Sequence, residues 1–127
     1  MSGRVQTFRD LRVWQAAMDL VEGVYRCTES SPRTELYGLT AQLHRAAVSI
    51  PSNIAEGQSR DHLNKYLHHL SFAQGSCAEI QTQLEIAVRL GFCGPEQIGD
   101  LTDMLAVIRR QLHALRNALQ KADDHVT

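Results

Sequence analysis

Long apolar runs, clustered cysteines and turn-forming residues are all scarce in this 127-residue sequence. No stretch approaches the roughly 18 apolar residues that a membrane-spanning helix needs, and the N-terminus lacks the apolar run of a signal peptide. The three cysteines, Cys27, Cys77 and Cys93, lie far apart, which argues against a zinc motif and against a secreted disulfide framework. These absences predict a cytoplasmic protein with reduced thiols and no membrane association.

An excess of one charge is also lacking, because the formal net charge is -1. A chain with this balance has no overall basic field that attracts nucleic acid, so such binding would need a local patch. Helix-favouring Leu, Ala, Gln, Glu and Arg are abundant, and the apolar fraction of 43% is ordinary for a globular protein. The composition therefore predicts one helical domain over residues 1–127.

Apolar residues recur every three or four positions and predict four helices, over about 8–27, 35–57, 61–90 and 95–122. Short connections between them favour antiparallel neighbours, so we predict an all-α fold, an antiparallel up-down-up-down four-helix bundle. Pro51 removes one backbone hydrogen bond and clashes with the preceding turn, which predicts a kink in the second helix near Pro51. We expect Gly57 to end that helix as a left-handed cap.

The first helix carries two adjacent apolar stripes, which is wider than one bundle core requires. We assign the stripe through Leu11 and Trp14 to the core and the stripe from Val13 to Val24 to a neighbouring subunit. Phe72 lies off the main stripe of the third helix. The predicted interface between subunits is Val13, Leu20, Val24 and Phe72.

The segment Ser49–Gly57 (SIPSNIAEG) interrupts this regular pattern with proline, serine, asparagine and glutamate. It could be a binding surface. We favour a structural interpretation, in which the polar side chains satisfy the freed backbone groups and one another. The predicted polar network between the second and third helices is Arg45, Asn53, Glu56 and Glu79.

Basic residues late in the fourth helix suggest a surface for nucleic acid or for a partner. The candidates are Arg45, Arg60, Arg109, Arg110, Arg116 and Lys121. The competing interpretation is a solvated face whose positive charges complement the helix dipole.

Signatures of catalysis and of cofactor binding are missing from the sequence. No Glu has a His three residues later, as the carboxylate di-iron bundles require. No nucleophile elbow and no phosphate-binding glycine loop occurs. We therefore predict no catalytic residue, no metal and no cofactor, although folding could still assemble a catalytic triad.

Four segments carry a family resemblance: Phe8–Trp14, Glu35–Gln42, Arg45–Gly57 with Arg60, and Ala73–Ser76 with Glu79, Gln83 and Leu84. In these segments the sequence resembles the proteins encoded within intervening sequences of bacterial 23S ribosomal RNA genes. The resemblance implies a four-helix bundle and, as in some members, a homopentamer; most members have no established activity. A related branch resembles the accessory variability determinant protein of diversity-generating retroelements, which works with a reverse transcriptase and RNA.

These observations together predict a non-enzymatic, cytoplasmic helical scaffold that assembles with itself as a homopentamer and serves a protein or ribonucleoprotein partner. The first alternative is a protein that binds RNA or DNA directly through the Arg-bearing surface. The second alternative is an enzyme with an unrecognised site.

Overall fold

The computed structural model describes residues 5–29 and 38–126, and within these ranges the chain is helical and contains no β-strand. A short 3-10 helix, η1 (Phe8–Asp10), precedes four long helices. These are α1 (Arg12–Thr28), α2 (Leu39–Gln58), α3 (Leu63–Arg89) and α4 (Pro95–Val126). The predicted all-α class and the four helices are confirmed. The predicted start of the second helix at residue 35 lies outside the described residues.

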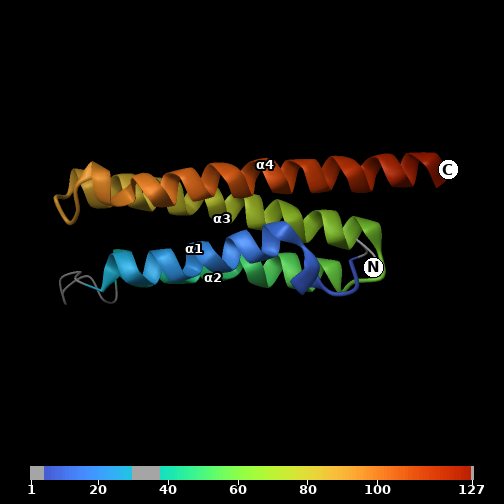
Figure 1. Ribbon diagram of the computed structural model, residues 1–127, viewed down its shortest axis with the longest axis horizontal. Helices are drawn as coiled ribbons and strands as arrows, with labels where there is room; N and C mark the ends of the chain where they lie inside the picture. Colours follow the sequence, from blue (N-terminus) through green and yellow to red (C-terminus); the bar gives the residue numbers. More distant parts are fainter. Residues whose placement is uncertain (1–4, 30–37, 127) are drawn as a thin grey trace.

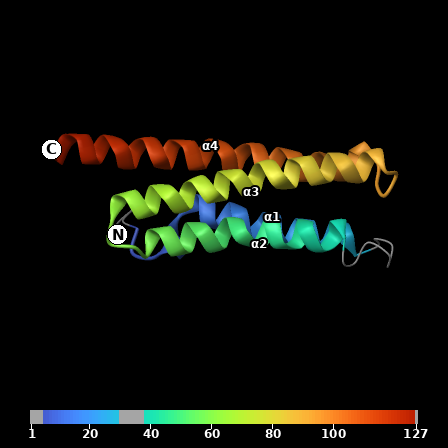
Figure 2. The same cartoon turned by 180° about the vertical axis from the view of Figure 1, so that it is seen from behind.

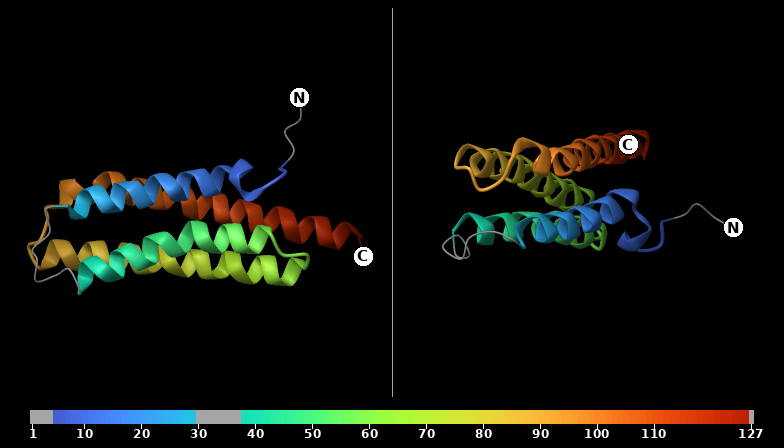
Figure 3. Two further views of the ribbon diagram at one scale, coloured as in Figure 1. Left: turned by 90° about the horizontal axis from the view of Figure 1, so that it is seen from below. Right: turned by 60° about the vertical axis from the view of Figure 1, so that its left-hand side comes forward.

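The four helices lie lengthwise beside one another (Figures 1 and 2). α1 packs against α2 and α4, and α3 packs against the same two helices. The connection from α2 to α3 lies at one end of the bundle and the turn from α3 to α4 at the other (Figure 3). At its C-terminal end, α4 reaches past the other helices (Figure 1).

A capping box bends the chain before α1 and divides the predicted first helix in two. The Thr7 hydroxyl accepts the N–H of Arg9 at 3.2 Å, and the Asp10 carboxylate accepts the N–H groups of Gln6 and Thr7 at 2.9 and 3.1 Å. These hydrogen bonds from the backbone lower the pKa of Asp10. Leu11 is extended, so the long helix begins at Arg12.

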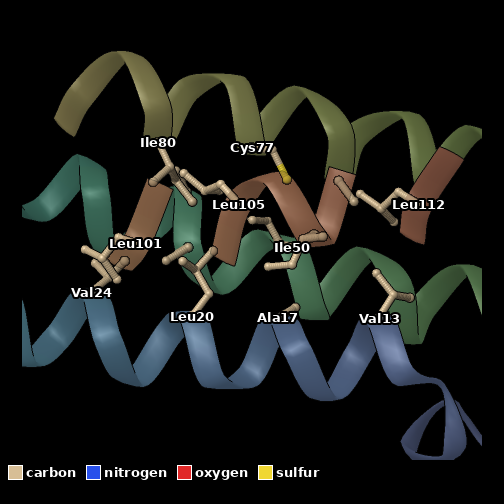
Figure 4. Close-up of a cluster of buried hydrophobic side chains, with 14 of the residues drawn as sticks. Val13, Ala17, Leu20, Val24, Ile50, Cys77, Ile80, Leu101, Leu105 and Leu112 are labelled. Atoms are coloured by element: carbon tan, nitrogen blue, oxygen red, sulfur yellow. The ribbon is translucent and has the colours of Figure 1, made fainter. Parts of the chain in front are cut away.

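The core stripe of α1 is the one that we assigned to a neighbouring subunit. Val13, Leu20 and Val24 are at most 4% exposed and point toward the other three helices (Figure 4). The prediction that these three residues face another subunit is therefore wrong. The two stripes are adjacent and both apolar, so helical spacing alone does not tell which one turns inward. Met18 and Tyr25, from the other stripe, are 41% and 44% exposed.

The glycine with left-handed backbone is Gly91 and not Gly57, which was expected to end the second helix. α2 continues through Pro51 to Gln58, and Gly57 is a buried residue within it. A Cβ atom on Gly57 would lie 2.9 Å from Cβ of His69, so close packing against α3 explains the glycine. The prediction of a left-handed cap at Gly57 is wrong. Gly91, with φ of 77°, is the left-handed glycine, and it follows the end of α3.

The seven-residue repeat of α4 forms its buried side. Its buried members are Ile98, Leu101, Leu105, Ile108 and Leu112. Leu115 and Leu119 are partly buried, and residues 120–123 are exposed. The helix thus leaves the core before it ends. Among the described residues, no helix has the length and apolar character to cross a membrane.

Candidate functional site

A groove of about 560 Å³ lies between α2 and α3, and we call it the α2–α3 groove. The groove arises where the two helices carry small residues. Ala46 and Ser49 on α2 lie opposite Gly75 and Ser76 on α3, and a Cβ atom on Gly75 would meet nothing within 4 Å. The remaining lining residues are Gln42, Arg45, Asn53, Ser71, Phe72, Glu79 and Gln83. The hollow therefore exists because large side chains are absent there.

Serine hydroxyls form the floor of the groove. Ser49 Oγ donates to the carbonyl of Ala46 at 2.9 Å, and it also contacts the hydroxyl of Ser76. Because the only hydroxyl proton of Ser49 is used, Ser76 donates to Ser49. The oxygens of both serines keep acceptor capacity. The side chain of Gln83 is also buried in this wall, and its oxygen has no hydrogen-bond partner.

Two opposite charges stand at the mouth of the groove, Arg45 on α2 and Glu79 on α3. Both are exposed, and they form no ion pair with each other in the part of the chain that the structure describes. The predicted network of Arg45, Asn53, Glu56 and Glu79 is therefore not one connected network. Arg45 and Glu79 only line the groove.

The other two members of that predicted network, Asn53 and Glu56, meet at His69, which the sequence did not single out. Asn53 donates to the carbonyl of Ser49 at 2.8 Å, and its side-chain oxygen lies 3.0 Å from Nδ1 of His69. Nε2 of His69 lies 4.0 Å from the Glu56 carboxylate, which pairs with Arg60 at 2.7 Å. The sequence contains one weak signal for this role: His69 directly precedes the core residue Leu70.

The six basic residues proposed as one surface lie in separate places. Arg45 lies at the groove and Arg60 follows α2, whereas the other four lie on α4, which does not contact α2 within the described residues. Arg116 donates to the side-chain oxygen of Gln74 at 2.8 Å and is partly buried. Only Arg109, Arg110 and Lys121 remain as an exposed basic group on one helix.

The comparison with known families gives one match, and it covers the groove completely. The model of a family described as "23S rRNA-intervening sequence protein" matches residues 9–114. The chain belongs to this family. No curated protein matches the chain.

A second feature of this 23S rRNA-intervening sequence family member lies between α1 and α2. The rings of Tyr25 and His44 stack with centroids 3.8 Å apart, and Nε2 of His44 lies 2.8 Å from the hydroxyl of Thr28. Burial lowers the pKa of His44, which favours the neutral ring. Tyr25 and Val48 line a shallow hollow beside this stack, and both are more than 40% exposed. Together with Met18 they form what we call the α1–α2 apolar surface.

Metal-binding groups do not gather in this family member: the described residues hold no cluster of three His, Cys, Asp or Glu side chains suited to a metal ion. Burial raises the pKa of the Cys77 thiol to about 11, although the positive charge of Arg109 opposes the shift. A thiol with this pKa carries almost no thiolate at neutral pH. Cys77 is therefore a packing residue and a poor nucleophile.

Proposed function

We propose that this protein is a non-enzymatic scaffold of the cytoplasm that assembles with itself, as a homopentamer, and serves a protein or ribonucleoprotein partner. The observation that carries the proposal is the α1–α2 apolar surface. Met18, Tyr25 and Val48 are 41%, 44% and 42% exposed. Tyr25 and Val48 line one hollow, and Met18 lies two helical turns before Tyr25 on α1. Groups of exposed apolar side chains are typical of interaction surfaces.

A closed ring of identical subunits needs a second, different surface on each subunit. A cluster near the turn from α3 to α4 supports this requirement. Ile86, Leu90 and Phe92 are 40%, 60% and 37% exposed and lie within seven positions of one another. Phe72, which is 51% exposed, remains the predicted interface residue on α3. Burial of both clusters in an assembly would remove apolar area from water and would stabilise the assembly by about 25 cal/mol for each Å² buried.

The same proposal includes the finer features of the bundle, the antiparallel up-down-up-down order and a kink of α2 near Pro51. Successive connections at opposite ends of the bundle support the order. The missing N–H of the proline supports the kink. A crystal structure in which α2 runs straight through Pro51 would contradict the proposed kink.

The experiment is a measurement of native mass by light scattering. Wild-type protein is expected at five times the chain mass of 14.2 kDa. Met18→Asp and Leu90→Asp each place a charge in one of the two clusters and should shift the mass toward monomer with helicity retained. Val107→Asp is the matched control, because Val107 is an exposed apolar residue of α4 outside both clusters. A monomeric wild type would contradict the proposal.

A second candidate function is direct binding of RNA or DNA by α4. The exposed group of Arg109, Arg110 and Lys121 favours it, and the resemblance to the accessory variability determinant protein points to RNA. If these residues bind phosphates, affinity for an RNA oligonucleotide should fall steeply between about 50 and 200 mM salt. Arg109→Gln with Arg110→Gln should reduce that salt dependence, whereas Arg12→Gln on α1 should leave it unchanged. Absence of binding at low salt would exclude this function.

A further inference from the structure

Gln83 lines the α2–α3 groove, and its side-chain oxygen is a buried acceptor with no hydrogen-bond partner among the described residues. The Gln83 side chain is 8% exposed, and it lines both the groove and the shallow hollow that continues it. A buried acceptor without a hydrogen bond is costly, so a donor placed there would stabilise the folded protein. The wall of the groove therefore offers a position for an N–H or O–H group.

The charge next to this acceptor selects the kind of donor. Glu79 lies four residues before Gln83, on the same side of α3, and it also lines the groove. Its carboxylate has no ion-pair partner among the described residues. A carboxylate beside a neutral amide oxygen and two serine hydroxyls favours a cationic donor, such as an ammonium group, over a neutral one.

The opposite wall carries the complementary charge. Arg45 lies four residues before Ser49 on α2, is exposed, and has no ion-pair partner within the described residues. A guanidinium group binds a carboxylate with two parallel hydrogen bonds. Arg45 and Glu79 thus present a cation and an anion on two sides of one hollow, and neither neutralises the other.

From this arrangement we infer that the α2–α3 groove binds a small zwitterion of the amino-acid class. The ligand ammonium group lies between Glu79 and Gln83, and its carboxylate lies on Arg45. The volume of about 560 Å³ is within the usual range for small-ligand sites, about 300–1,000 Å³. One chain supplies every residue of the groove, so the inference does not rest on self-association.

The test uses the full-length, ¹⁵N-labelled protein and three related probes: L-phenylalanine, its methyl ester and N-acetyl-L-phenylalanine. The ester lacks the carboxylate and the N-acetyl form lacks the ammonium group. We expect saturable shifts of the amide signals of Ser49, Gly75 and Ser76 with the free amino acid. Affinity should be at least about tenfold weaker for each derivative, because each lacks one ion pair.

Two variants test the assigned roles. Arg45→Gln should abolish the preference for the amino acid over its ester, and Glu79→Gln should abolish the preference over the N-acetyl form. The controls are Arg12→Gln and Asp103→Asn, which remove exposed charges outside the groove. They should bind as the wild type does.

Three results would overturn the inference. One is the absence of saturable shifts at about 10 mM L-phenylalanine, ten times a weak dissociation constant of about 1 mM. The second is equal affinity for all three probes, which would mean that neither the ammonium group nor the carboxylate of the ligand contributes to binding. The third is unchanged selectivity in both groove variants.

Discussion

The contact between α1 and α4 and the contact between α2 and α3 are built from different kinds of side chain. α1 and α4 contribute buried aliphatic residues such as Leu20, Val24 and Leu105. α2 and α3 also contribute buried aliphatic residues such as Ile50 and Ile80, but beside the groove they meet through the hydroxyls of Ser49 and Ser76. Their contact is the most extensive of any helix pair within the described residues. A hollow lined by charged residues lies beside each contact, of about 620 Å³ between α1 and α4 and about 560 Å³ between α2 and α3. Only the second has a floor of serine hydroxyls and a buried amide oxygen in its wall, so we expect ligand binding to depend on α2 and α3.

The largest effect on the free energy of unfolding should come from the aliphatic residues between α1 and α4. Leu20→Ala removes a fully buried side chain, and the cavity should lower the free energy of unfolding by about 3 kcal/mol. Asp19→Ala, at an exposed position of the same helix outside the α1–α2 apolar surface, is the control and should change the free energy of unfolding by less than about 0.5 kcal/mol. Urea unfolding at one fixed protein concentration measures both variants. Similar losses in the two variants would contradict the burial of Leu20 in the core.

The second largest effect on stability is expected where α2 packs closely on α3. Gly57→Ala would place a methyl group 2.9 Å from Cβ of His69 and 3.3 Å from the carbonyl of Tyr66. Neither atom is the end of a flexible side chain, so we expect a loss of about 1–3 kcal/mol in thermal or urea unfolding. Gly75→Ala is the contrasting variant, because its methyl group would enter open space. Higher helix propensity should then raise stability by about 0.5–1 kcal/mol, and a loss there would show that the groove is tighter than described.

Alkaline pH tests the burial of Cys77 on α3. Its folded-state pKa of about 11 exceeds the ordinary value of 9.0. The folded protein keeps a proton that the unfolded chain loses, so the stabilisation is complete below pH 9 and is lost as the pH rises to about 11. At pH 10 the loss should be about 1 kcal/mol. The measurement is the slope of the unfolding free energy against pH, which should be less steep in Cys77→Ala than in the wild type. An equal slope in the two proteins would show that the Cys77 thiol does not cause the loss of stability.

The smallest effect is expected at the ion pair of Arg60 with Glu56, at the end of the α2–α3 contact. The two side chains are 44% and 53% exposed, so solvent screens their attraction. Glu56→Gln should lower the free energy of unfolding by less than about 0.5 kcal/mol. A loss above 1 kcal/mol in urea unfolding would indicate that Glu56 also supports His69. His69→Gln in the Glu56→Gln background would then measure that coupling in a double-mutant cycle.

Sequence reasoning worked where one physical signal dominates. The existence of α4 followed from apolar residues that recur every three or four positions, and the same residues, such as Ile108 and Leu112, are its buried side. It failed for α1, because two apolar stripes satisfy the same periodicity and only packing against α2 and α4 selects between them. The break at Leu11 was missed because the signal is a capping box formed by Thr7 and Asp10, which periodicity does not detect.

The polar site was predicted in part. Arg45, Asn53 and Glu79 do lie between α2 and α3, as their spacing suggests. Their partners could not be predicted, because the contact of Asn53 with His69 joins positions sixteen apart on two helices. Helical periodicity fixes the face of a residue, whereas the relative axial shift of the helices decides which polar groups meet.

α4 is longer than the other three helices, and this affects the position of any group that is attached to its end. Its 32 residues span about 48 Å, and its exposed final turns project beyond the ends of the companion helices. A reporter group fused after this helix would stand clear of the other three helices and would not cover the α2–α3 groove. Because these turns pack against no other helix, fluorescence anisotropy of such a fusion would report the local motion of the helix end together with the tumbling of the protein.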